Sequence, residues 1–281
     1  MKYGFVLPYG DAQIAADFAH AAEAAGWDGF FVWESVWGWD AWMLLTAAAM
    51  RTQRIRLGTM ITPLSRMRPW ELAGKAVTLD HLSQGRVILS VGLGAIDTGF
   101  AEFGEVTDRK TRAELLDEGL EIVTGLWRGQ PFNYDGQHYH LKETKFYPPP
   151  PPVQQPHIPI WVVGAWPKGK SMQRVLRYDG LLPTRMDEQG QHIGFTADHI
   201  REMKTYIDAN RTSTTPFDIV VEGRTPGTDP DRAAEITRIW AAGGATWWIE
   251  ALWGDPDQPV DYEAIRQRIQ QGPPRFDRTD Q

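Results

Sequence analysis

The sequence predicts a (β/α)8 TIM barrel, a closed sheet of eight parallel strands surrounded by helices. Strand-like and helix-like segments alternate along the whole chain, and eight such pairs can be identified. Eight is a strand number that closes a barrel, and 281 residues is a typical length for one. An open, doubly wound sheet is the alternative for this alternation. We expect residues 1–281 to form a single domain.

The clearest of these units runs from Arg54 to Gly94. A buried strand over Ile55–Ile61 precedes a helix that begins at Pro69, and a second buried strand covers Val87–Val91. Two strands joined through a helix form a parallel pair with a right-handed crossover. Both strands therefore end at the same face of the sheet, which is where enzymes of this architecture bind their ligands.

The other elements follow from local signals. Apolar, β-branched and aromatic runs predict six more strands, over Lys2–Leu7, Gly29–Trp33, Pro159–Val163, Gly180–Pro183, Phe217–Val221 and Ala245–Ala251. Helix starts are expected at Asp11, Thr196 and Asp229-Pro230, and helix ends at Gly26 and Gly243-Gly244. Apolar stripes predict further helices over Trp39–Met50, Asp108–Trp127, Lys170–Arg177 and Asp261–Gln271.

One insertion interrupts the alternation after the fourth helix. Residues Pro131–His140 alternate in polarity around an Asp-Gly pair, which predicts a β-hairpin. Residues Pro148–Pro152 are expected to form a stiff polyproline segment that leads to the fifth strand. His138 and His140 share one face of the hairpin, but no third ligand is evident, so we expect no metal site.

Composition excludes several classes of function. A net charge of −7 disfavours nucleic acid as a partner, and the absence of cysteine excludes disulfides, thiolate catalysis and cysteine-bound metals. The longest apolar run, Ala41–Met50, is too short to cross a membrane, and no signal peptide is apparent. Most of the 13 tryptophans are expected in the core. We expect a cytoplasmic protein that acts on a small molecule.

A candidate phosphate site follows the fifth strand. The segment Gly164–Ser171 (GAWPKGKS) is glycine-rich, carries two lysines and leads into a helix. Free N–H groups and the helix dipole favour an anion at such a position. A solvated loop would account for the same residues.

Three carboxylates, Glu34, Glu222 and Glu250, lie at or near strand ends. Two carboxylates about 5–10 Å apart could hydrolyse a glycosidic bond. Alternatively, Glu34 could orient a cofactor ring or a substrate, or act as an acid. No serine lies in a G-x-S-x-G turn, so the sequence gives no support for acyl transfer.

Three segments together resemble the luciferase-like monooxygenase superfamily, whose members are TIM barrels that bind FMN or the deazaflavin coenzyme F420. They are GTMITPLSRMRPWELAGKAVTLDHLSQGRVILSVGLG, then DRKTRAELLDEGLEIVTGLWRGQPFNYDGQHYHL after the Phe103-Gly104 turn, and PIWVVGAWPKGKSMQRVLRYDGLLP. The resemblance covers nearly the whole chain. It implies an oxidoreductase whose cofactor ring lies across the mouth of the barrel. Hydride transfer with F420 and oxygenation with FMN both remain open.

The resemblance also implies site residues. The ring would rest on a bulge in the third strand with a cis peptide bond at Met60–Ile61. The cofactor-binding candidates are Trp33, Thr59, Met60, Ile61, Gly92, Leu93, Gly94, Gly164, Ala165, Trp166, Lys168 and Lys170. Glu34 and Trp39 are the catalytic candidates. Trp39 matches an aromatic residue of the deazaflavin sugar-phosphate dehydrogenases, and Glu34 could orient the ring or a substrate, or act as an acid.

Three positions depart from well-known members. Ser35 stands where bacterial luciferase and the sugar-phosphate dehydrogenases carry a histidine, Ala95 replaces an acidic residue of those dehydrogenases, and Val91 replaces a phosphate-binding arginine of the luciferase. The resemblance therefore implies neither light emission nor sugar-phosphate oxidation, and the missing histidine favours a reductase or dehydrogenase. A non-catalytic flavin-binding barrel is the second hypothesis. Dimers formed through the early helices are common in the family, so the resemblance allows a homodimer.

Overall fold

The computed structural model describes residues 1–145, 148–187, 192–254 and 258–276. Eight strand positions form the barrel, in the order β1 (Lys2–Leu7), β2 (Gly29–Val32), β3 (Arg56–Thr59), β5 (Val87–Gly92), β8 (Ile160–Trp166), β9 (Gly180–Met186), β11 (Asp218–Gly223) and β12 (Trp247–Ala251). β12 pairs with β1 in parallel and closes the ring. The predicted (β/α)8 barrel is confirmed, and the open sheet is excluded.

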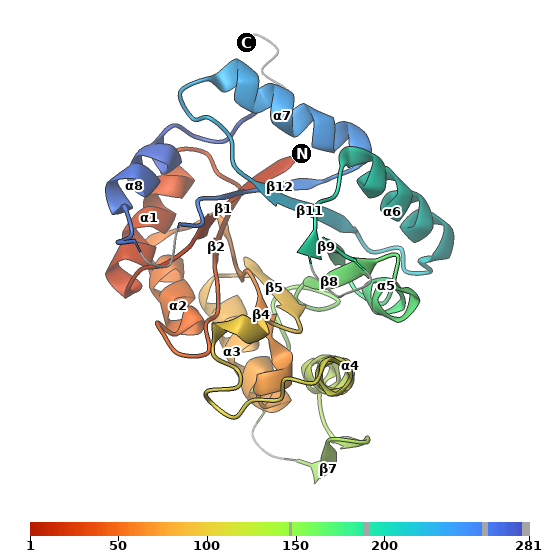
Figure 1. Ribbon diagram of the computed structural model, residues 1–281. Helices are drawn as coiled ribbons and strands as arrows, with labels where there is room; N and C mark the ends of the chain where they lie inside the picture. The colour runs from red at the N-terminus through yellow and green to blue at the C-terminus, as the bar shows by residue number, and fades with distance from the viewer. Residues whose placement is uncertain (146–147, 188–191, 255–257, 277–281) are drawn as a thin grey trace.

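The helices surround the strands (Figure 1). They are α1 (Ala12–Ala24), α2 (Ala41–Arg51), α3 (Pro69–Leu82), α4 (Arg109–Arg128), α5 (Gly169–Val175), α6 (Ala197–Asn210), α7 (Pro230–Gly243) and α8 (Tyr262–Gln270). The Asp40 side chain accepts hydrogen bonds from the N–H groups of Trp42 and Met43, in the first turn of α2. The helix therefore begins at Ala41, and the start predicted at Trp39 is wrong. In the part of the chain that is described, no helix is long and apolar enough to span a membrane.

The third strand position is broken in the middle. β3 pairs with β2 and β5, whereas β4 (Thr62–Pro63) pairs with β5 alone. The peptide bond between Met60 and Ile61, which separates β3 from β4, is cis. The continuous strand predicted over Ile55–Ile61 is therefore wrong in its extent, while the cis bond implied by the resemblance is confirmed. A short 3-10 helix, η1 (Leu64–Arg66), then leads to α3.

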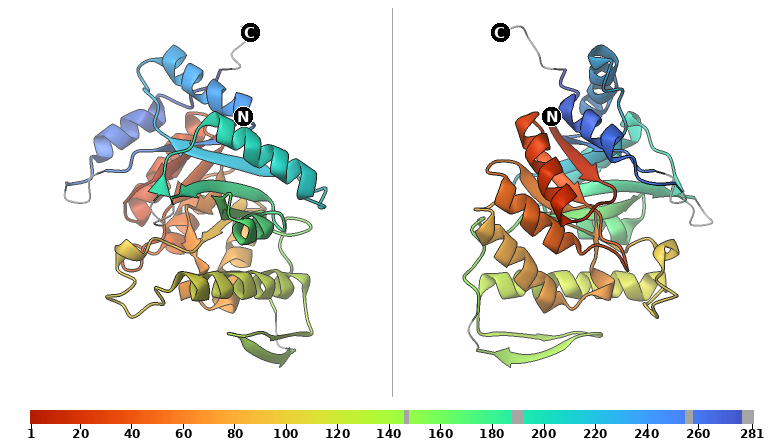
Figure 2. Two further views of the ribbon diagram at one scale, coloured as in Figure 1. Left: turned by 45° about the vertical axis from the view of Figure 1, so that its right-hand side comes forward. Right: turned by 90° about the vertical axis from the view of Figure 1, so that its left-hand side faces the viewer.

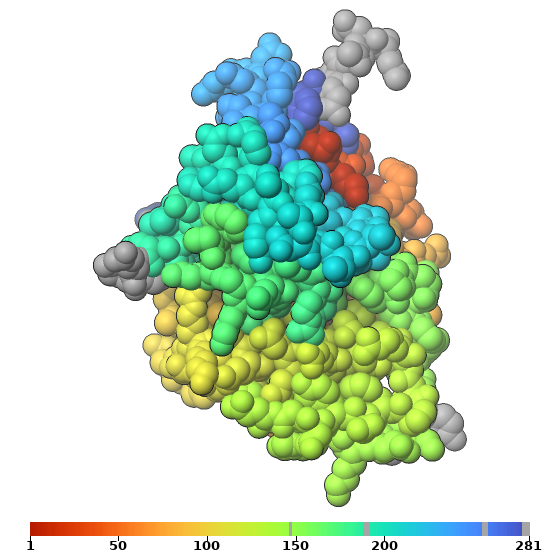
Figure 3. Space-filling model, turned by 90° about the vertical axis from the view of Figure 1, so that its right-hand side faces the viewer, coloured from red at the N-terminus to blue at the C-terminus, as the bar shows by residue number. Residues whose placement is uncertain are grey.

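The insertion after α4 is the predicted hairpin. β6 (Phe132–Asp135) and β7 (His140–Thr144) pair in antiparallel fashion, and Figures 1 and 2 show the hairpin on the side of α4 that faces away from the barrel. The Glu118 carboxylate of α4 accepts hydrogen bonds from consecutive backbone N–H groups of the hairpin turn, at residues 137–139. Figure 3 shows the yellow-green segment of α4 between the light green hairpin and the green segment that contains α5.

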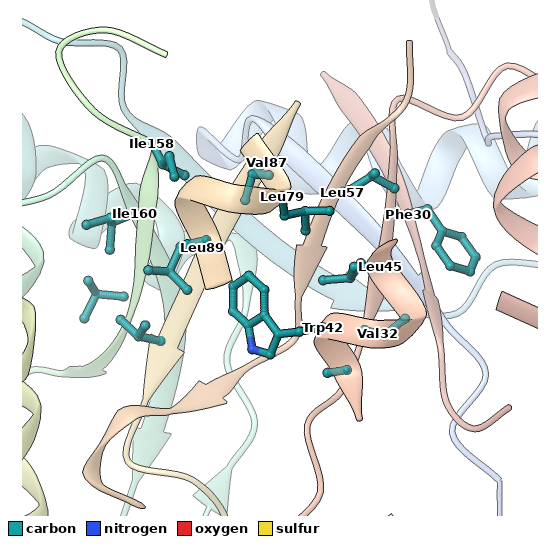
Figure 4. Packing of buried hydrophobic residues seen from close by; sticks show 14 of the residues in the cluster. Phe30, Val32, Trp42, Leu45, Leu57, Leu79, Val87, Leu89, Ile158 and Ile160 are labelled. Atoms are coloured by element: carbon teal, nitrogen blue, oxygen red, sulfur yellow. The ribbon is translucent and has the colours of Figure 1, made fainter. Parts of the chain in front are cut away.

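Two apolar clusters hold the barrel together. The outer cluster packs strand residues such as Leu57 and Leu89 against helix residues such as Trp42 and Leu45 (Figure 4). The inner cluster fills the barrel with the rings of Phe31, Trp161 and Trp247, whose centroids lie 5.2–6.0 Å apart. Because these rings occupy the interior, a ligand of the barrel can bind only at its mouth.

Candidate active site

The mouth of the barrel has an apolar floor. Met60, Ile61 and Val163 are half-buried and pack on the inner aromatic cluster. Gly92 lies beside them: a Cβ atom at this position would lie 2.5 Å from Cδ1 of Ile61 and 2.8 Å from Cγ2 of Val163. Ile61 thus occupies the space that Gly92 leaves free, and the floor is continuous across the break in the third strand.

The backbone that follows β5 is fixed by Arg112 of α4. Its Nη1 donates to the carbonyl oxygens of Leu93 at 2.8 Å and of Gly94 at 3.1 Å. Gly94 has φ +77°, which favours glycine, and a Cβ there would lie 2.7 Å from Phe100 and from Pro63. The sequence analysis missed Arg112, although a charged residue close to the apolar stripe of a predicted helix is a signal that could have revealed it.

The segment after the fifth strand departs from its prediction. β8 extends to Trp166, so Gly164, Ala165 and Trp166 belong to a strand rather than to a phosphate-binding loop. A Cβ at Gly164 would lie 2.4 Å from Leu181 and 2.8 Å from Val175, and the Trp166 ring packs 5.6 Å from that of Tyr206 in α6.

Side chains alternate along a strand, so Gly164 and Trp166 face the helices and only Ala165 faces the interior. Gly164 and Trp166 therefore lie on the helix side of the strand and do not face the mouth. Lys168 and Lys170 are exposed around the start of α5, where Lys168 is the N-cap residue.

Glu34 is the most buried of the mouth carboxylates. It follows β2, and only 10% of its side chain is exposed. Thr62 of β4 places its hydroxyl 2.7 Å from Oε2 of Glu34 and 3.0 Å from the Thr59 hydroxyl, which in turn donates to the carbonyl oxygen of Ser90 at 3.2 Å. Thr59 and Thr62 are completely buried, so Thr59 presents no side chain to a ligand.

Burial raises the pKa of the Glu34 carboxyl above its ordinary value of 4.5. Thr62 and the charges of Arg66 and Lys75 oppose this rise, and Asp40 adds to it. Arg66 Nη2 lies 3.7 Å from Oε1 of Glu34 and also donates to the carbonyl oxygen of Ser35. A carboxyl whose pKa is raised in this way keeps its proton to a higher pH than an exposed carboxyl does.

Glu34 and Trp39 line the same cavity, of about 840 Å³, between the segment after β2, the start of α3 and α4. Trp39 is half exposed there. Two polar atoms of the lining residues, Ser65 Oγ and Arg66 Nε, are buried without a hydrogen-bond partner among the described residues. Trp33 does not line this cavity; it lines a smaller recess with Leu7 and Tyr9, and Trp39 lines both.

The other two strand-end carboxylates differ in role. Glu250 is fully buried and accepts hydrogen bonds from Thr225, Trp248 Nε1 and Arg268 Nε, so it belongs to an ion pair outside the mouth. Glu222 lies at the end of β11 and accepts a hydrogen bond from Trp253 Nε1 at 2.6 Å, and enclosure by the protein raises its pKa. Glu250 therefore cannot serve in the glycosidase arrangement considered above.

The residues at the mouth fit a flavin-type cofactor. An apolar floor of Met60, Ile61 and Val163 can support a planar ring, and the Glu34 carboxyl is hydrogen-bonded to Thr62, the residue that follows Ile61. The Ser90 hydroxyl, on the neighbouring strand, is buried without a hydrogen-bond partner in the described structure.

Comparison with known proteins supports the same assignment. The family model described as luciferase-like monooxygenase matches residues 4–271. The F420-dependent glucose-6-phosphate dehydrogenase of Amycolatopsis mediterranei (strain U-32) is 30% identical over 241 residues, which are 80% of this chain and 68% of that protein. A putative coenzyme F420-dependent oxidoreductase of Mycobacterium tuberculosis is 38% identical over 151 residues, which are 51% of this chain and 42% of that protein.

Solved structures share the fold. Monooxygenase RslO1 from Streptomyces bottropensis superposes with a TM-score of 0.75 at 21% identity, covering 96% of both chains. The coenzyme F420-dependent tetrahydromethanopterin reductase from Methanopyrus kandleri gives a TM-score of 0.74 at 17% identity, covering 96% of this chain and 98% of that one. These matches agree with the predicted enzyme class, an oxidoreductase with a flavin-type cofactor. The chain belongs to the luciferase-like monooxygenase family.

Proposed function

We propose that the protein binds coenzyme F420 at the barrel mouth and catalyses hydride transfer between this cofactor and a small organic substrate. The observation that carries the proposal is the apolar floor of Met60, Ile61 and Val163, together with the buried Glu34 carboxyl, which accepts a hydrogen bond from Thr62, the residue that follows Ile61. Sequence relatives named for F420 favour this cofactor. FMN with oxygenation of the substrate is the second candidate, favoured by the fold shared with a monooxygenase over 96% of both chains.

In this proposal the floor holds the cofactor ring, with the backbone of Gly92, Leu93 and Gly94 at its edge. Lys168 and Lys170, exposed around the start of α5, attract the phosphate of the cofactor tail. When bound, F420 supplies or accepts the hydride. Glu34 gives a proton to the substrate oxygen during reduction, or takes one during oxidation, and Trp39 provides an aromatic wall for the substrate in the cavity that both residues line.

Anaerobic turnover tests the proposal. The purified protein is mixed with reduced F420 and a panel of aldehydes, ketones, imines and activated alkenes, and oxidation of the cofactor is followed by absorbance. We expect oxidation that depends on both protein and substrate, and at least a hundredfold loss with Glu34→Gln. Reaction with reduced FMN and oxygen alone would instead favour the second candidate. Binding without turnover of either cofactor would indicate the non-catalytic barrel.

We further propose that residues 1–281 act as one catalytic domain in a cytoplasmic homodimer. The apolar side chains of Met43 and Met50 lie seven residues apart on α2 and are 59% and 66% exposed, and Trp70 of α3 is 41% exposed. A second copy that packs on α2 and α3 would bury them. Light scattering should give the mass of a dimer for the native chain and of a monomer for a Met43→Glu/Met50→Glu variant.

A further inference from the structure

We propose that Glu222 is a specificity-determining residue of the barrel mouth, and that its carboxylate binds a positively charged nitrogen of an organic substrate. The class of substrate is therefore a compound with a protonated amine or an iminium group. Its role as the substrate of a hydride transfer rests on the proposed function, whereas binding of the cation can be measured without cofactor.

Glu222 points into the barrel rather than towards the helices. In the parallel pairing of β11 with β12, Val220 lies opposite Trp247, and Glu222 lies opposite Ile249. Val220, Trp247 and Ile249 all belong to the inner cluster. Side chains alternate along a strand, so Glu222 faces the same side as Val220, one layer nearer the mouth. Glu222 is exposed there, whereas the three apolar residues are buried.

The position of β11 in the ring places Glu222 opposite the apolar floor. The ring has eight strand positions, and β11 is four positions from β3 in either direction. Met60 and Ile61 of the floor follow β3 directly. Figure 1 shows β11 and β4, the second part of the third strand position, on opposite sides of the barrel. A planar ring that rests on the floor would thus turn its free face towards the side of Glu222.

The Glu222 carboxylate has a single partner in the described part of the chain. Trp253 Nε1 donates to Oε1 at 2.6 Å. In the same ranges of the chain, no lysine or arginine forms an ion pair with Glu222, and no group donates to Oε2. The indole therefore holds one oxygen in place and leaves the other for a ligand.

The other two strand-end carboxylates each have an arginine beside them. Glu34 Oε1 lies 3.7 Å from Arg66 Nη2, and Glu250 Oε1 lies 3.3 Å from Arg268 Nε. Of the three, only Glu222 lacks a cation among the described residues. Desolvation raises the pKa of Glu222, and a cation beside the carboxylate would lower this pKa again. The protein thus leaves the counterion of this carboxylate to be supplied by a ligand.

A charged nitrogen suits this carboxylate better than a neutral donor does. A hydroxyl or an amide can donate to Oε2, but it leaves the negative charge without a counterion in a mouth that a bound ring encloses further. An ammonium or iminium N–H donates to the same oxygen and neutralises the charge. The Trp253 side chain, 45% exposed, adds an aromatic surface next to the carboxylate, and such surfaces attract organic cations.

A matched pair of probes tests the inference. Benzylammonium and benzyl alcohol are similar in size and shape, and only the first is charged at neutral pH. In calorimetric titrations, the cofactor-free protein should bind benzylammonium about tenfold more tightly than benzyl alcohol, the effect of one charge-assisted hydrogen bond. Glu222→Gln, which keeps the shape of the side chain, should remove this preference, and Glu222→Asp should retain part of it. Glu202→Gln, exposed on α6, is the control and should leave the preference unchanged.

Equal affinity of the native protein for the two probes, or a preference that survives in Glu222→Gln, overturns the proposal. Tighter binding of benzyl alcohol also overturns it, because the site then takes neutral donors. Glu222 is exposed, so Glu222→Gln should fold normally, which thermal unfolding verifies.

Turnover separates this inference from the proposed function. With reduced F420, Glu222→Gln should raise the KM of a cationic substrate and leave the KM of its neutral analogue unchanged. A protein that prefers the cation but turns over F420 with no substrate would contradict the proposed function and leave the assignment of Glu222 intact. Turnover of neutral carbonyl compounds without a preference for cations would do the reverse.

Discussion

The side chain of Ile61 lies in the space that a side chain at Gly92 would need. The Cβ of an alanine at Gly92 would approach Cδ1 of Ile61 to 2.5 Å, closer than real side chains pack. This contact joins the break in the third strand position to β5, the strand with which β4 pairs at Thr62–Val91 and Pro63–Gly92. The floor of the mouth therefore depends on a glycine in one strand and an isoleucine in the next.

Substitution of Gly92 by alanine should disturb the floor. Overpacking of this kind typically costs about 1–3 kcal/mol of folding free energy, and displacement of Ile61 should weaken cofactor binding at least tenfold. Urea unfolding and cofactor titration measure the two effects. Gly74→Ala in α3 is the control, because nothing lies within 4 Å of the added Cβ, and it should be neutral or stabilising. Equal behaviour of the two variants would contradict the packing described for the floor.

The pH dependence of the free energy of unfolding should report the raised pKa of Glu34. Its pKa is raised in the folded protein, so the folded state holds the proton more tightly than the unfolded state does. The resulting stabilisation is complete below the ordinary value of 4.5 and is lost as the pH rises through the folded pKa. Glu34→Gln should lack this loss and gain stability relative to the native protein as the pH is raised.

Glu23 provides a control of opposite sign. Burial raises its pKa, but the backbone N–H groups of Ile55, Arg54 and Gln53 outweigh this and lower it overall. The stabilisation from Glu23 should be present above the ordinary value and lost as the pH falls through the folded pKa. Urea unfolding across a pH series measures both variants, and a parallel pH dependence for Glu23→Gln and Glu34→Gln would refute the assignment.

The lysines around the start of α5 should contribute to cofactor affinity through charge. Replacing Lys168 and Lys170 together by methionine should weaken binding about tenfold at low salt, and the loss should shrink as salt screens the charges. Lys142→Met on the exposed hairpin strand β7 is the control. A salt-independent loss, or an equal loss in the control, would speak against a phosphate contact.

Replacing Glu250 should lower the free energy of unfolding. Glu250→Gln leaves the Arg268 guanidinium without its 3.3 Å partner in a buried setting, and breaking such a pair typically costs about 3–5 kcal/mol. The exposed pair of Arg232 and Glu235 should cost less than about 1 kcal/mol when Glu235 is replaced by glutamine. Chemical denaturation compares them, and a Glu250→Gln variant as stable as Glu235→Gln would show that this cluster contributes little.

The sequence predicted the barrel well because strand and helix periodicity is a local property, and Asp11 and Asp229 cap helices at the expected points. The direction in which each strand-end side chain points was harder to predict from the sequence. β8 continues three residues further than its apolar run suggested, and this turns Gly164 and Trp166 towards the helices. Glu250 and Glu222 looked equivalent in the sequence, but their positions on neighbouring strands place them on opposite sides of the sheet.

The hydrogen-bond chain at Glu34 could not be predicted from the sequence. Thr59, Thr62 and Glu34 come from three strand ends, and their contacts depend on the break at Met60–Ile61 that brings Thr62 alongside Glu34. The cis bond itself was inferred only by resemblance to a family. Arg112 contacts the Leu93 carbonyl across 19 positions, a pairing that no local pattern encodes.

Anaerobic titration of the protein with F420 and, separately, with FMN, followed by cofactor absorbance and quenching of tryptophan fluorescence, tests the central claim most directly. We predict saturable binding of F420 with a dissociation constant in the micromolar range, weakened at least tenfold by Gly92→Ala and unaffected by Gly74→Ala. Absence of binding by both cofactors, or binding that Gly92→Ala leaves unchanged, would contradict the placement of a flavin-type ring on the floor of the barrel mouth.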